Sequence, residues 1–240
     1  MILISSRGTY QRNSWRDIIT RPSNLSGLCL ILDQEVLRVN PAQAMSQVLE
    51  AGVKFFQYRN KRGTRREIYE TSLQLVPLAR RAGALFIVND HADIALAVDA
   101  DGVHLGQDDL PLKHARNLLG SGKLIGISTH GPDQAKVAEA GGADYIGFGP
   151  VFRTSTKDAG PVQGIEKITA IKRIVSVPVI AIGGITLANV GAVISAGADG
   201  VAVISSVLSA PDRKVAAMEM MREIQKNRMQ ASEVRGMNDE

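Results

Sequence analysis

The feature of this sequence that most constrains its fold is a regular alternation of short apolar runs with helix-forming segments, which begins at residue 28. The runs are largely continuous in apolar residues, which is typical of parallel strands covered by helices on both faces. Eight runs occur, at 28–32, 53–58, 84–89, 102–105, 124–128, 145–149, 179–183 and 200–205. Eight strands in strict alternation with helices predict an α/β fold, a single (β/α)8 TIM barrel. A doubly wound open sheet is the alternative, but no glycine-rich dinucleotide motif follows the first run.

Capping signals mark several of the expected helices. Asn40 is followed by Pro41, a cap residue and a proline at the first helical position, which predicts a helix over 41–50. A long amphipathic helix is predicted over 64–81, and Gly83 follows it where a helix commonly ends in a left-handed residue.

The chain is predicted to hold one catalytic domain with an extension at each end. A barrel of this type takes about 250 residues, which suits a chain of 240 residues. We assign the (β/α)8 barrel to 27–228. Residues 1–26 form an N-terminal extension, expected to be an accessory helix or a mobile arm, and residues 229–240 are expected to be a frayed C-terminal tail.

The net charge of +4 does not indicate a nucleic-acid partner, because residues 1–26 hold four arginines against one aspartate and no clustered basic face follows. No apolar run approaches the roughly 20 residues that span a bilayer. The N-terminus does not read as a secretory signal. The single cysteine, Cys29, excludes an internal disulfide and a cysteine-based zinc site. We expect a cytoplasmic protein without a membrane partner; the sequence leaves a homo-oligomer open.

Polar residues gather at the predicted strand ends, where barrel enzymes carry their sites. The second run continues into Gln57, Tyr58, Arg59, Asn60 and Lys61. A planar guanidinium and a lysine are suited to phosphate oxygens, so the segment indicates an anion clamp. A solvated loop is the alternative.

Two aspartates end neighbouring runs. Asn89 and Asp90 close the third run, and Asp109 follows the fourth. Two carboxylates without cysteine or clustered histidine nearby favour Mg²⁺ over zinc. Alternatively, Asp90 caps the following helix. The lone His104 is interpreted as a packed, hydrogen-bonded residue rather than a ligand.

The later strand ends indicate further phosphate contacts. After the sixth run comes a hydroxyl-rich loop of Thr154, Ser155 and Thr156 that ends in Lys157. Gly184 follows the seventh run, and the eighth ends in Ile204 and Ser205. Glycine after the seventh strand and a small polar residue after the eighth match the usual phosphate site of barrels.

Taken in order, these segments resemble the thiamine-phosphate synthase family over about residues 28–208. The resembling segments are 57–61, 88–90, 100–109, 126–128, 149–152, 154–157 and 182–185. The resemblance implies that a pyrimidine carrying a diphosphooxymethyl group is joined to a thiazole phosphate, which releases diphosphate and gives thiamine phosphate. The resemblance implies either 4-methyl-5-(2-phosphoethyl)thiazole or its carboxylated form as the thiazole phosphate, and the sequence does not decide between the two.

The resemblance also implies a role for each residue. The pyrimidine diphosphate would be held by Gln57, Tyr58, Arg59, Asn60, Lys61, Asn89, Ser128 and Lys157. The thiazole phosphate would be held by Thr154, Ser155, Thr156, Gly184, Ile204 and Ser205. Mg²⁺ would be held by Asp90 and Asp109. The residues expected to act in catalysis are Ser128, Lys157, Arg59 and Lys61.

Two departures and two rival functions accompany the resemblance. Arg153 stands where the family usually has proline, and residues 1–26 exceed the family's pattern. The rivals are a thiazole tautomerase, which needs neither diphosphate clamp nor metal, and a non-catalytic phosphate-binding regulator on the same fold. The sequence does not decide whether the loop over 149–164 closes over substrate.

Overall fold

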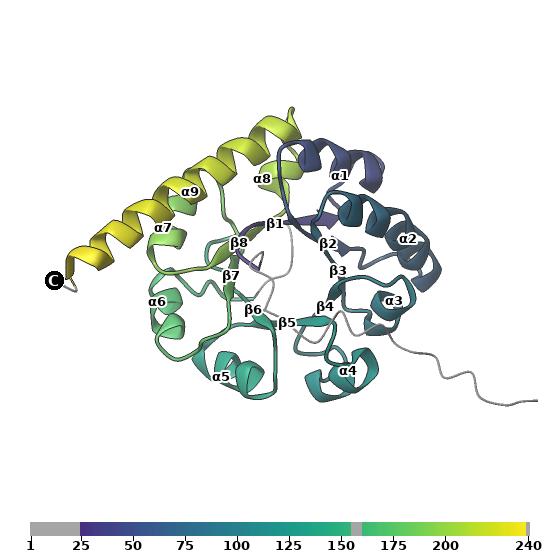
Figure 1. The fold of residues 1–240 in the computed structure, drawn as a ribbon, viewed down its shortest axis with the longest axis horizontal. Helices are drawn as coiled ribbons and strands as arrows, with labels where there is room; N and C mark the ends of the chain where they lie inside the picture. The colour runs from purple at the N-terminus through teal and green to yellow at the C-terminus, as the bar shows by residue number, and fades with distance from the viewer. Residues whose placement is uncertain (1–24, 155–159, 239–240) are drawn as a thin grey trace, which may run out of the picture.

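The computed structural model describes residues 25–154 and 160–238, and its eight strands close into a parallel barrel surrounded by helices (Figure 1). The strands are β1 (Gly27–Asp33), β2 (Phe55–Arg59), β3 (Leu85–Asn89), β4 (Gly102–Leu105), β5 (Leu124–Thr129), β6 (Tyr145–Phe148), β7 (Val179–Ile182) and β8 (Gly200–Val203). Each strand pairs in parallel with the next, and β1 pairs with β8. The predicted TIM barrel is confirmed.

Helices follow the strands and form the outer layer (Figure 1). They are α1 (Pro41–Glu50), α2 (Arg65–Arg81), α3 (Ala92–Ala97), α4 (Leu112–Leu119), α5 (Pro132–Ala140), α6 (Glu166–Lys172), α7 (Val190–Ser195), α8 (Ser205–Leu208) and α9 (Arg213–Asn238). No helix among the described residues is long and apolar enough to cross a membrane.

Alternation along the strands divides the core in two. Leu30 and Phe56 belong to the larger cluster, which lies between the strands and the helices. Cys29, Phe55 and Ile87 belong to a smaller cluster that fills the barrel interior. The interior is apolar toward the beginnings of the strands, so the polar side chains at the carboxyl ends of the strands lie above a layer of apolar side chains.

The predicted cap at Asn40 is present, and α2 begins with a capping box that was not predicted. The Asn40 side chain accepts a hydrogen bond from the amide of Ala42, and Thr64 forms a reciprocal capping box with Glu67 at the start of α2. The alternative role of Asp90 is not supported, because His91 occupies the cap position of α3 and no side-chain cap is formed there.

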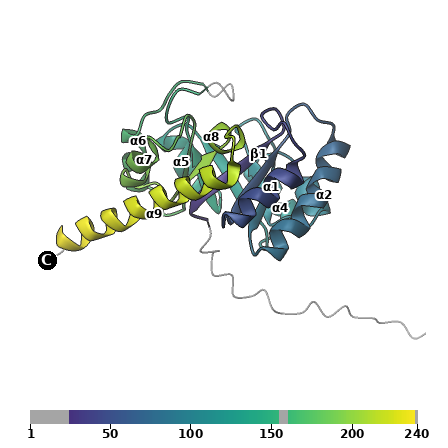
Figure 2. The same ribbon diagram turned by 90° about the horizontal axis from the view of Figure 1, so that it is seen from above.

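In the C-terminal segment the structure has one helix, α9, which runs for 26 residues to Asn238. It includes most of 229–240, the segment that was expected to be a frayed tail. Figure 2 shows α9 lying along the outside of the barrel and extending past the neighbouring helices. Residues 229–235 contain no glycine or proline to end the helix. The expectation for 1–26 concerns mostly residues 1–24, which lie outside the described residues.

Candidate active site

The end of β2 places alternate side chains in the barrel interior. Gln57 and Arg59 share the inward face with Phe55 and are buried. Arg59 donates through Nη1 to the Oδ2 atom of Asp33, 2.5 Å away, and Asp33 is fully buried at the end of β1. The buried carboxylate compensates the guanidinium and fixes one edge of it, while the other N–H groups of the planar fork keep a defined direction.

The structure does not bring Tyr58 and Asn60 into this interior. Tyr58 faces the helices and packs in the larger core cluster, because its place on the strand has the opposite parity from Gln57 and Arg59. The side-chain Oδ1 atom of Asn60 accepts from the backbone amide of Gly63 at 2.8 Å, which stabilises the turn before α2. Both residues support the clamp segment from outside the barrel.

Lys61, Asp90 and Asp109 come together above the ends of β2, β3 and β4. Lys61 forms an ion pair with the Oδ2 atom of Asp90. Asp109 accepts from the amide of Gly106 at 2.6 Å. Partial burial, and then the adjacent Asp90 carboxyl, raise the pKa of Asp109 above its ordinary value. The two predicted ligands are therefore close enough to interact.

The acidic side chains shown to interact here are Asp90 and Asp109. Among the described residues there is no group of three or more histidine, cysteine, aspartate or glutamate side chains that could hold a metal ion. Two carboxylates are the number that Mg²⁺ typically takes from a protein, with waters and substrate phosphates completing its shell.

A polar chain crosses the interior below these residues. His104 on β4 lies 3.0 Å through Nε2 from the hydroxyl oxygen of Ser128 on β5, and 3.1 Å through Nδ1 from the hydroxyl of Tyr145 on β6. The expectation that His104 is a packed, hydrogen-bonded residue is confirmed. Its partner Ser128 is a predicted substrate contact, which sequence reasoning did not connect to it. Asn89 ends β3 beside His104 in the sheet register.

The loop after β6 is anchored on the loop after β7. The amides of Val151 and Phe152 donate to the carbonyls of Ile182 and Gly183, at 2.9 and 3.0 Å. Gly184 has a φ of +63°, and an added Cβ would lie 2.4 Å from the Arg153 carbonyl oxygen. Close packing therefore requires glycine at position 184. The absence of a side chain also leaves the backbone there open to an approaching anion.

The predicted thiazole-phosphate residues are only partly described. Thr154 ends the described part of the loop, and Ser155, Thr156 and Lys157 lie outside the described residues. Ile204 and Ser205 lie at the start of α8. The Ser206 hydroxyl donates to the carbonyl of Ile185 at 2.9 Å, which ties the end of β8 to the loop that carries Gly184. Arg153 has an exposed side chain.

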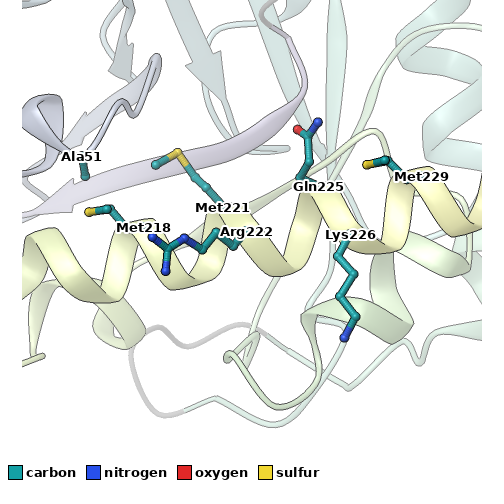
Figure 3. A pocket seen from close by; sticks show the side chains of 7 residues that line it. All are labelled: Ala51, Met218, Met221, Arg222, Gln225, Lys226 and Met229. Carbon is teal, nitrogen blue, oxygen red and sulfur yellow. The ribbon is translucent and has the colours of Figure 1, made fainter.

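A separate surface groove lies on the outer helices and away from the strand ends. Figure 3 shows its lining, which comes from α9 and the end of α1 and consists of Ala51, Met218, Met221, Arg222, Gln225, Lys226 and Met229. The groove contains none of the residues predicted for the site.

The comparisons with known proteins agree with the arrangement at the strand ends. A family model described as thiamine monophosphate synthase matches residues 28–207. The thiamine-phosphate synthase of Chlorobium luteolum is 48% identical over 195 residues, which cover 81% of this chain and 91% of the relative. That of Methanospirillum hungatei is 50% identical over 189 residues, which cover 78% and 91%.

A solved structure gives the same result. The thiamine phosphate pyrophosphorylase from Pyrococcus furiosus is similar with a TM-score of 0.78 and 38% identity, and the match covers 85% of this chain and 98% of that one. The matched region contains the predicted site residues and every strand except Gly27, the first residue of β1. The chain belongs to the thiamine monophosphate synthase family, whose activity, the synthesis of thiamine phosphate, makes it a transferase.

Proposed function

We propose that the strand-end site joins 4-amino-2-methyl-5-(diphosphooxymethyl)pyrimidine to the ring nitrogen of a thiazole phosphate and releases diphosphate. The observation that carries the proposal is the grouping of Lys61, Asp90 and Asp109 above the buried Arg59 at the carboxyl ends of β2 to β4. Cations next to paired carboxylates suit a diphosphate with its metal ion, and neither a tautomerase nor a phosphate-binding regulator needs that combination.

The paired carboxylates fit Mg²⁺. Burial and the adjacent Asp90 carboxyl raise the pKa of Asp109, and a divalent cation bound at the two carboxylates would favour the ionised form of Asp109. Asp90 and Asp109 would hold the ion, and the oxygen-only donor set suits magnesium rather than a softer metal. When bound, the ion would neutralise charge on the diphosphate oxygens.

The protein's own groups have a defined task in the proposed reaction. Cleavage of the bond to diphosphate leaves a pyrimidinylmethyl cation, which the 4-amino group of the ring stabilises by electron donation. Negative charge gathers on the departing diphosphate, and Arg59 and Lys61 are proposed to compensate it. The thiazole nitrogen carries no proton, so no general base is needed. Positioning and charge neutralisation then account for the rate.

The remaining assignments keep the roles expected from the resemblance. Gln57, Asn89 and Ser128 are proposed to contact the pyrimidine diphosphate from the barrel interior, and Lys157 from the loop after β6. Thr154, Ser155, Thr156, Gly184, Ile204 and Ser205 are proposed for the thiazole phosphate. A cytoplasmic location, the absence of a nucleic-acid partner and the oligomeric state stay predictions.

An assay of the condensation tests the function. The protein is mixed with both phosphorylated substrates and Mg²⁺, and thiamine phosphate is converted to fluorescent thiochrome and followed in time. We expect signal that grows with enzyme concentration and is suppressed when the metal is chelated before the substrates are added. A signal no greater than that of heat-denatured protein would overturn the proposal, and turnover that survives chelation would remove the metal from it.

A further inference from the structure

We infer that Tyr145 and His104 form a directional hydrogen-bond relay that holds Ser128 as a hydrogen-bond donor toward the substrate. Ser128 belongs to the site described above, whereas Tyr145 and His104 act through Ser128 and are positioning residues. The inference rests on the proposed function in one respect, namely that Ser128 contacts the pyrimidine diphosphate.

The relay depends on a glycine between two strands that are not neighbours. In the sheet register His104 on β4 is opposite Gly126 on β5, and Gly126 is opposite Tyr145 on β6. A Cβ at Gly126 would lie 2.1 Å from Cζ of Tyr145 and 2.5 Å from Nδ1 of His104. Only a residue without a side chain allows the two rings to meet across β5.

The direction of the relay follows from the position of the Tyr145 hydroxyl proton. Tyr145 is completely buried, and desolvation raises its pKa well above the ordinary value, so its hydroxyl stays protonated. Nδ1 of His104 lies 3.1 Å from this hydroxyl oxygen. A buried hydroxyl is destabilising unless it donates to an acceptor, so the single phenol proton is directed to that nitrogen.

The tautomer of His104 follows from that contact. A neutral imidazole that accepts at Nδ1 carries its proton on Nε2. That N–H points at the Ser128 hydroxyl oxygen at 3.0 Å, so Ser128 accepts from the histidine. Its own proton remains available for an acceptor atom of the substrate. The Ser128 carbonyl also accepts from the Gln107 side chain at 2.6 Å, which fixes the backbone that carries this hydroxyl.

The tautomer can be measured without any turnover. Long-range proton–nitrogen NMR of the intact, uniformly ¹⁵N-labelled protein distinguishes the two nitrogens of each of the four histidines. His104→Gln identifies the signal of interest by its disappearance. We expect neutral His104 with its proton on Nε2, and a changed Nδ1 shift in Tyr145→Phe. A proton on Nδ1 would overturn the relay whether or not the protein is an active synthase.

Kinetics test whether the relay acts through Ser128. We expect His104→Ala to lower kcat/KM for the pyrimidine diphosphate by about tenfold, the upper range for one hydrogen bond. His104→Gln, which can still donate an N–H, should recover part of that loss. In a Ser128→Ala background, His104→Ala should cost little more, because the group it positions is already absent.

His114→Gln is the matched control for the substitutions of His104. His114 is exposed on α4, so this variant should have the kcat/KM of the wild type. Multiplicative losses for His104→Ala and Ser128→Ala in folded, active protein would show that His104 does not act through Ser128. Failure of the wild type in the thiochrome assay would count against the proposed function instead, and the NMR result would still decide the relay.

Discussion

At the scale of single residues, the contact between Asp90 and Asp109 decides the behaviour of the site with pH. The pKa of Asp109 is raised by burial and then by the neighbouring carboxyl. A carboxyl whose folded pKa lies above its unfolded value destabilises the folded protein at pH values above the folded pKa. That cost disappears as the pH falls below the unfolded pKa. Without a metal ion, the ionised Asp109 carboxylate therefore lowers the stability of the folded protein near neutral pH.

Asp109→Asn should therefore separate stability from activity. The amide keeps an oxygen acceptor for the Gly106 amide but removes the repelling charge, so we expect the metal-free variant to melt no lower than the wild type at neutral pH. Loss of a metal ligand should lower kcat/KM by about 100-fold or more, equivalent to about 2.7 kcal/mol. Calorimetric melting and the thiochrome assay measure the two effects. A destabilised variant with wild-type turnover would contradict both statements.

At the scale of elements, Gly184 allows the loop after β6 to pack against the loop after β7, and we call these two packed loops the platform. Gly184 has a positive φ and lies against the Arg153 carbonyl, so the loop after β6 can reach its position only if no side chain is present there. The hydrogen bond from the Ser206 hydroxyl to the Ile185 carbonyl connects the loop after β7 to the start of α8.

Gly184→Ala should damage the platform through both strain and collision. We expect a loss of about 1–3 kcal/mol in the free energy of unfolding, and a larger rise in KM for the thiazole phosphate than for the pyrimidine diphosphate. Denaturant unfolding and steady-state kinetics measure these quantities. Gly122→Ala is the matched control, since a Cβ there meets nothing within 4 Å. Equal effects of the two substitutions would refute the packing argument.

At the scale of the whole molecule, α9 joins the end of the chain to the beginning of the barrel. It packs against α7, α1 and β1, close to the seam where β8 meets β1. Ala217, Met220 and Ile224 are buried on its inner side, whereas Met229, further along the same helix, is exposed. The buried apolar side chains of the described part of α9 therefore lie in its first half.

Ile224→Ala and Met229→Ala should differ sharply in stability. Removing a buried isoleucine side chain leaves a cavity and costs about 2–5 kcal/mol, whereas the exposed methionine should contribute within about 0.5 kcal/mol. Neither residue lies near the strand ends, so kcat should stay unchanged in both folded variants. Chemical denaturation provides the comparison, and similar midpoints for the two variants would show that this face of α9 does not hold the barrel closed.

The barrel could be predicted from the sequence because every strand is a short apolar run and every connection contains a helix. Asp90, Asp109 and Lys61 could be predicted because strand ends of a barrel converge. Strand parity would have excluded Tyr58 from the interior, since Gln57 and Arg59 share one face and Tyr58 takes the other. The pairing of Arg59 with Asp33, and of His104 with Ser128 and Tyr145, depends on the register between strands, which one sequence does not specify.

The empty position at Gly126 has a consequence for anyone who redesigns this barrel. It makes the side chains opposite it on β4 and β6 a coupled unit, so replacing either ring alone leaves a void or an unsatisfied polar atom beside the other. New substrate preferences should be sought by exchanging His104 and Tyr145 as a pair while the glycine is retained. A library that varies one position at a time would discard such solutions.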